Sequence, residues 1–149
     1  MQAEEARYPQ THRDPVAVTA SLCTMLAYVA RTHTERVDLL EVGRYWSARV
    51  EDLLRASVRD RPFVPNDQVL DVRFHEFMAH EVTMVKCIYE FAEQPMTEDA
   101  QRAVKSFMVA NPRGKLGRIA YHLEDFGLDP RERRQALRFY QERFDVPDE

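Results

Sequence analysis

Glycine is scarce in this sequence, and its distribution is uneven. Only four glycines occur in 149 residues, and none precedes Gly43. The other three, Gly114, Gly117 and Gly127, lie close together towards the other end. Because glycine permits positive φ angles and close backbone approach to a ligand, the best candidate for a glycine-containing ligand loop is the segment that begins at Gly114.

Long apolar runs and a hydrophobic leader are missing as well. No apolar stretch approaches the roughly 20 residues that a membrane-spanning helix needs. Residues 1–10 are acidic and polar and contain no signal-peptide core. The sequence therefore predicts a protein without a membrane span, with the cytoplasm as its default location.

Cysteine and histidine are too few for most metal centres. We expect Cys23 and Cys87, which both fall in predicted amphipathic helices, to be reduced core residues rather than a disulfide or a nucleophile. His75 and His80 lie near each other without a cysteine or a third histidine, so no metal site is expected. His12 is a conceivable acid or base, but its place in a polar segment favours an exposed loop residue.

The charge balance limits the possible partners. The formal net charge is −4, which disfavours broad nucleic-acid binding and requires any anion site to be local. The composition, 44% hydrophobic and 31% charged, is typical of a globular protein rather than of disorder. We expect one domain over residues 1–149, with residues 1–10 as a loose N-terminal segment.

Hydrophobic periodicity predicts a mostly helical chain. About five helices and one or two short strands are expected, which suits either a helical protein or part of an α/β domain. A strand is predicted at 69–74, with a weak one near Tyr8. The predicted helices cover residues 15–32, 36–60, 80–93, 97–111 and 130–144.

The apolar residues of these helices indicate which faces are buried. In the last helix, the solvated face is expected to consist of Arg131, Glu132, Arg133 and Arg134. The core side is expected to consist of Leu137, Tyr140 and Phe144. Gly43 interrupts the second helix and is expected to mark a close packing point. In the first helix, the face predicted to pack consists of Val18, Leu22, Met25, Leu26 and Val29.

Two segments have the properties of anion-binding loops. Arg13 stands immediately before an Asp-Pro helix start, at the positive end of a helix, and Ser21 follows within that helix. Towards the other end, the basic, glycine-containing segment 113–118 carries Arg113 and Lys115. Two such loops meeting in space would clamp a phosphate.

These residues resemble, over roughly residues 9–146, the sulfotransferases that use 3′-phosphoadenosine 5′-phosphosulfate (PAPS), in particular the bacterial branch. In that family an Arg and a Ser eight residues later hold the 3′-phosphate of the donor, and Arg13 and Ser21 match this spacing. The family's basic loop over the same phosphate is similar to 111–118, with Arg113, Gly114 and Lys115.

The resemblance also suggests a nucleotide contact at Phe74 and a reaction. Phe74 stands where the family has a Tyr near the adenine, although a phenylalanine here is also a typical core residue. The implied activity is the transfer of a sulfuryl group from PAPS to a small hydroxyl acceptor, without a metal. In this mechanism the 3′-phosphate contacts position the nucleotide, whereas other groups act on the reacting sulfur.

The chain departs from the family at its start. The family opens with a strand and a Ser/Thr/Gly-rich loop that cradles the 5′-phosphosulfate, and its catalytic base lies upstream of the Arg–Ser pair. Only about a dozen residues precede Arg13. The chain therefore resembles the C-terminal portion of such an enzyme, a truncated or degenerate relative that keeps the 3′-phosphate elements, has no identified catalytic residue and is expected to be inactive alone.

An alternative hypothesis comes from a different functional class. Helices that would pack on a sheet in the complete fold would leave apolar faces exposed, and such faces drive association. The chain would then be a non-catalytic helical interaction or dimerisation module. Its partners would be a second copy of itself or a separately encoded N-terminal part.

Overall fold

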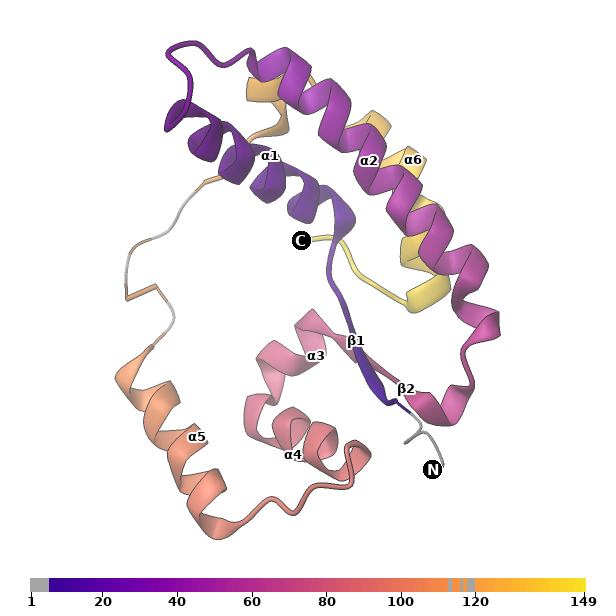
Figure 1. The fold of residues 1–149 in the computed structure, drawn as a ribbon, viewed down its shortest axis with the longest axis vertical. Coiled ribbons are helices and arrows are strands. Elements are labelled where there is room, and N and C mark those ends of the chain that lie inside the picture. The colour runs from indigo at the N-terminus through magenta and orange to yellow at the C-terminus, as the bar shows by residue number, and fades with distance from the viewer. Residues whose placement is uncertain (1–5, 113, 116, 118–119) are drawn as a thin grey trace. The chain divides into compact units, whose positions relative to one another are not determined.

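The computed structural model describes residues 6–112, 114–115, 117 and 120–149 of the chain. It divides into two compact units (Figure 1). The first comprises Met1–His12 and Val64–Ile119, and the second comprises Arg13–Phe63 and Ala120–Glu149. Six α-helices and two strands are present among the described residues, so the mostly helical prediction is confirmed.

The first unit contains a two-stranded parallel sheet followed by three helices. Strand β1 (Tyr8–His12) pairs with β2 (Val69–Arg73), with Tyr8 opposite Val69 and His12 opposite Arg73. The strand expected near Tyr8 is therefore present, and it includes the last three residues of the segment 1–10 that the sequence predicts to be loose. The helices of this unit are α3 (Phe74–Ala79), α4 (Glu81–Phe91) and α5 (Glu98–Ala110).

His12 corrects a second expectation about this segment. The sequence predicts an exposed loop histidine, but His12 is the last residue of β1 and only 1% exposed. Its Nε2 lies 2.9 Å from the Oδ1 of Asp71 on β2, 59 positions away in the sequence. A buried polar ring requires such a partner, and the pairing depends on a strand contact that local sequence does not show.

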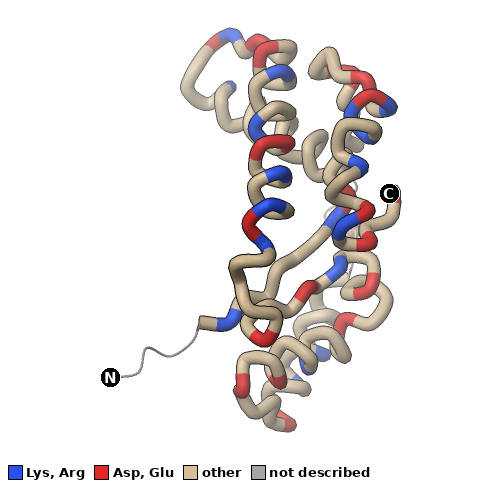
Figure 2. The backbone as a smooth tube through the Cα atoms, turned by 90° about the vertical axis from the view of Figure 1, so that its right-hand side faces the viewer, with Lys and Arg blue, Asp and Glu red and all other residues tan. Residues whose placement is uncertain are grey.

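The second unit is built from three long helices. They are α1 (Pro15–Arg31), α2 (Leu39–Asp60) and α6 (Pro130–Phe144). A short 3₁₀ helix, η3 (Leu123–Phe126), precedes α6 and packs against α1 and α2. An aspartate caps each long helix: Asp14, Asp38 and Asp129 accept backbone N–H groups of the first turn. Figure 2 shows residues of both charge signs interleaved along α2 and α6, whereas α1 carries a single charged residue, Arg31.

The buried face of α1 is not the predicted one. Its smaller residues face the core: Ala20 packs with Leu123 and Leu137, and Cys23 and Ala27 pack with Phe126. Of the predicted face, Leu22 and Leu26 are half-buried, whereas its other three residues are directed outward. Met25 is 54% exposed, and Val18 and Val29 are exposed as well. Small side chains allow α1 to lie close to its neighbours, and several of its bulky apolar residues remain in solvent.

Gly43 marks a close packing point, as predicted. A Cβ atom at this position would lie 2.3 Å from the backbone oxygen of Phe126 and 2.7 Å from its Cβ. Only glycine therefore fits between α2 and η3. The prediction for α6 is also confirmed at Leu137, Tyr140 and Phe144, which are all buried.

Two further expectations concern the thiols and the membrane. Cys23 is buried, Cys87 is half-buried, and both are free thiols. Burial raises the pKa of the Cys23 thiol, which suits a core residue better than a nucleophile. None of the helices in the described part of the chain is long and apolar enough to cross a membrane.

Candidate functional site

The candidate site lies at the start of α1. Asp14 is the N-cap of this helix: its Oδ1 accepts the backbone N–H of Val16 at 2.9 Å, and its side chain is fully buried. Pro15 occupies the first turn. Because both Asp14 and Pro15 suit a helix start, Arg13 is held immediately outside the N-terminus, where its side chain is 43% exposed.

Arg13 and Ser21 line the same cavity. The cavity has a volume of about 320 Å³ and lies between the first turns of α1 and the segment that includes Tyr121 and His122. Arg134 of α6 lines it as well. The structure thus brings together the two residues that the spacing in the sequence pairs, and it adds a second guanidinium.

Three carboxylates approach the two arginines. Glu149 accepts from Arg13 in a bidentate arrangement, with Nε–Oε1 3.0 Å and Nη2–Oε2 2.8 Å. Arg134 donates to Asp14, with Nη2–Oδ2 3.0 Å, and also to Asp148. Two guanidinium groups face three carboxylates here, so the formal charge of this cluster is −1.

The charge states of these groups follow from their contacts. The hydrogen bond to Glu149 raises the pKa of Arg13. Partial burial lowers the pKa of Arg134, but Asp14 and Asp148 outweigh this effect and raise it. The hydrogen bond from Gln141, with help from Arg134, lowers the pKa of Asp148. Both arginines therefore remain cationic at neutral pH.

Arg134 corrects the prediction that residues 131–134 form a solvated face. Arg131 and Glu132 are exposed, as expected. Arg133, however, donates to Glu51 of α2 at 3.2 Å, and the Arg134 side chain is only 26% exposed. Arg134 was not recognised as a site residue because its partner Asp14 lies 120 positions away in the sequence.

The remaining predicted site residues belong to the first unit. Phe74 is half-buried and begins α3, where the sequence predicts the end of a strand. Gly114 has a φ of +75°, a conformation that favours glycine. The Lys115 Nζ donates to the Ala110 carbonyl at 2.8 Å, at the end of α5. Arg113 lies outside the described residues.

The comparisons with known proteins settle the family. A family model described as "Sulfotransferase family" matches residues 3–99. The chain belongs to the sulfotransferase family. No curated protein matches it.

A solved structure supports the same assignment. This member of the sulfotransferase family is similar to a sulfotransferase from Mycobacterium avium, with 25% sequence identity and a TM-score of 0.78. The likeness covers 91% of the present chain but 35% of that protein. The resemblance drawn from the sequence is thus confirmed at the level of family and fold, and the chain corresponds to a part of the solved enzyme.

Proposed function

We propose that this chain is the part of a PAPS-dependent sulfotransferase that binds the 3′-phosphate of the nucleotide. The observation that supports this proposal is that Arg13 and Ser21 line one cavity at the start of α1. A guanidinium, a hydroxyl group and the N-terminal end of a helix are together suited to an anion.

The aspartate beside the cavity is compatible with a bound phosphate. Asp14 is needed to cap α1, and its negative charge alone would repel an anion. Arg134 offsets this charge through its 3.0 Å contact with Asp14. Because a guanidinium matches phosphate and carboxylate in the same planar, two-pronged geometry, the bidentate pairing of Arg13 with Glu149 indicates how Arg13 would hold a phosphate.

The second half of the phosphate site remains a prediction. Arg113, Gly114 and Lys115 would close over the phosphate that Arg13 holds, and the Lys115 ammonium would leave the Ala110 carbonyl to do so. We expect the Arg13 guanidinium and this loop to approach within about 10 Å in the nucleotide complex, which is the electrostatic screening length at about 0.1 M salt. Phe74 would offer its ring to the adenine.

The proposed role is positioning rather than transfer. Sulfuryl transfer needs a base for the acceptor hydroxyl and charge stabilisation at the reacting sulfur. The residues of this cavity would orient the donor through its remote phosphate, which converts binding energy into alignment. No metal is required for this role. We expect the chain alone to bind nucleotide without transferring sulfate to a hydroxyl acceptor.

Calorimetric titration with adenosine 3′,5′-bisphosphate tests the proposal. We expect Arg13→Ala to weaken binding about 10- to 100-fold, the effect of losing a charge-assisted hydrogen-bonding partner. Arg36→Ala is the matched control, because Arg36 is an exposed arginine of the same unit outside the cavity. Adenosine 5′-monophosphate lacks the 3′-phosphate and should bind weakly and equally to both variants. Equal affinity of the wild type for the two nucleotides would exclude a 3′-phosphate site.

The interaction module remains a second candidate, supported by a separate observation. Met25, Tyr28 and Val29 form an exposed apolar group on α1. A face of this kind favours association with another protein surface or a second copy. Gel filtration at several concentrations, read together with the calorimetric titration, distinguishes the candidates. Nucleotide binding in any oligomeric state supports the first candidate, and oligomerisation without nucleotide binding supports the second.

A further inference from the structure

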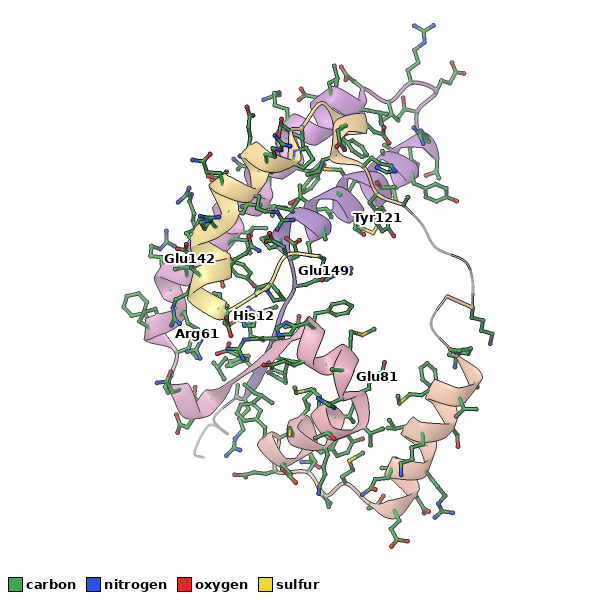
Figure 3. All side chains as sticks on the ribbon, turned by 180° about the vertical axis from the view of Figure 1, so that it is seen from behind. His12, Arg61, Glu81, Tyr121, Glu142 and Glu149 are labelled. Atoms are coloured by element: carbon green, nitrogen blue, oxygen red, sulfur yellow. The ribbon has the colours of Figure 1, made fainter. Side chains whose placement is uncertain are left out.

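The Glu149 carboxylate pairs with the guanidinium of Arg13, the group that the proposed function assigns to a phosphate. Its carboxylate engages both Nε and Nη2 of Arg13, with contacts of 3.0, 3.1 and 2.8 Å. Glu149 lines the same cavity as Arg13 and Ser21. Figure 3 shows Glu149 on the segment that follows α6.

The backbone of this segment is held by contacts that do not involve Arg13. Val146 is buried among Tyr140 and Phe144, and its N–H donates to the Gln141 carbonyl at 3.0 Å. The Gln141 side chain donates to Asp148 at 2.8 Å. These contacts fix the direction of the segment along α6.

The backbone of Glu149 is held separately from its side chain. Its N–H donates to the Oδ2 of the buried Asp14 at 2.9 Å. Asp148, the preceding residue, is also paired with Arg134. The Glu149 carboxylate can therefore leave Arg13 by rotation of its own side chain, without detaching the segment.

We propose that the Glu149 carboxylate is an internal competitor that occupies the anion position on Arg13 until a phosphate-bearing ligand displaces it. Glu149 uses the edge of the guanidinium formed by Nε and Nη2, and a phosphate bound at this same edge would exclude the Glu149 carboxylate. The inference rests on the proposed function for the identity of the displacing ligand, but not for the presence of an anion position.

The relative strength of the two acceptors favours displacement by a phosphate. A tethered group competes at an effective concentration on the order of millimolar, so it suppresses weak monovalent anions. A phosphate monoester carries about 1.5 to 2 negative charges at pH 7 and three acceptor oxygens, against one charge on a carboxylate. Glu149 would therefore make the site selective for dianionic groups.

The charge-removing variant Glu149→Gln tests this competition directly. It keeps the size of the side chain and the backbone hydrogen bond to Asp14 but removes the charge that holds Arg13. The matched control is Glu142→Gln, which removes the same charge from an exposed position on α6 (Figure 3). Binding of adenosine 3′,5′-bisphosphate and of inorganic phosphate is measured by calorimetry for the wild type, both single variants and Glu149→Gln combined with Arg13→Ala.

The expected result is a gain in affinity confined to Glu149→Gln. Removing the partly exposed Glu149–Arg13 ion pair should tighten binding of at least one probe about fivefold. The affinity of Glu142→Gln should stay within about twofold of the wild type, because solvent and salt screen an exposed charge. The gain should vanish in the double variant. A gain for phosphate alone would support the competition and refute the nucleotide function.

Three results would overturn the inference. One is equal affinity of the wild type and Glu149→Gln for both probes. Another is a gain that persists without Arg13, which would place the anion elsewhere. The third is the absence of binding by every variant, because there would then be no anion position for Glu149 to occupy. A drop in melting temperature of Glu149→Gln with unchanged affinity would assign Glu149 a structural role only.

Discussion

Arg134 and Asp14 lie 120 positions apart in the sequence, and their side chains meet at 3.0 Å beside the candidate phosphate cavity. Asp14 is fully buried at its side chain, whereas Arg134 retains 26% exposure. The same carboxylate caps α1 and accepts the backbone N–H of Glu149. One residue thus connects the helix start, α6 and the segment after α6.

This connection predicts an unequal cost of removing two helix caps. We expect Asp14→Ala to lower the free energy of unfolding by about 2–4 kcal/mol, because it removes a cap and leaves Arg134 without its buried partner. Asp38→Ala, at the exposed cap of α2, should cost about 1 kcal/mol. Chemical denaturation measures both. Equal losses would mean that the Asp14–Arg134 contact adds nothing to stability.

Gly43 gives a second prediction about stability. Gly43→Ala should destabilise the fold by about 1–3 kcal/mol despite the better helix propensity of alanine, because the new Cβ would meet the Phe126 backbone at 2.3 Å. Gly114→Ala is the comparison, since no atom lies within 4 Å of its added Cβ and only the positive φ is strained. That strain costs about 1–2 kcal/mol. A neutral Gly43→Ala in urea denaturation would contradict the close packing of α2 on η3.

The ion pairs of Glu51 are expected to make the free energy of unfolding depend on pH in the acid range. Its hydrogen bond from Arg55, and more weakly the charges of Arg133 and Arg55, lower the pKa of Glu51 below its ordinary value of 4.5. A depressed carboxylate pKa stabilises the fold above pH 4.5, and this contribution is lost as the pH falls through the folded-state value. We expect Glu51→Gln to cost about 0.5–1 kcal/mol at pH 7.

The pH series for Glu51 has a clear signature. The difference in melting temperature between the wild type and Glu51→Gln should shrink as the pH is lowered below 4.5. Glu142→Gln, at an exposed position, serves as the control and should show little difference at any pH. A gap between the wild type and Glu51→Gln that stays constant down to pH 3 would show that the ion pair does not stabilise the protein.

The isolated chain is predicted to lack sulfuryl transfer. With only the 3′-phosphate elements present, the electrostatic stabilisation of the reacting sulfur that dominates such catalysis would be missing. The assay follows transfer from PAPS to phenols and alcohols. Turnover that survives purification and disappears in Arg13→Ala would contradict this prediction.

The exposed face of α1 predicts association. Burying a large apolar side chain contributes roughly 1.5–3 kcal/mol, against a net stability of about 5–15 kcal/mol. We expect the chain to self-associate, to bind a separately encoded partner or to be partly folded. Analytical ultracentrifugation with circular dichroism measures this, and Met25→Lys should shift the distribution towards monomer. A cooperatively melting wild-type monomer at high concentration would show that this face needs no cover.

Local signals predicted the helix starts better than the helix faces. Asp14, Pro15 and Thr97 identify helix starts because capping depends on neighbours in sequence. The prediction of the buried face of α1 was wrong because large apolar residues usually indicate the core, whereas here Ala20 and Cys23 pack inward. Helix α3 was missed because six residues are too few for periodicity to show.

The candidate site was predictable only in part. Their spacing in the sequence predicts that Arg13 and Ser21 lie near each other, and both line one cavity because both belong to the same helix start. Arg134 and Glu149 reach the same place from more than 100 positions away, as their contacts with Asp14 show. Nothing in their own neighbourhoods distinguishes them from surface charges.

The division of the chain constrains the order of folding. Each unit is discontinuous. Strand β1 must wait for β2, which follows residues 13–68, and α1 and α2, although they pack on each other, must wait for η3 and α6 to complete their contacts. Closing such loops before any contact forms is slow relative to local helix formation. During synthesis, neither unit can be completed before the residues that follow Phe63 have emerged. A ribosome-bound intermediate would therefore expose the inner faces of α1 and α2, which makes this chain a candidate for chaperone dependence.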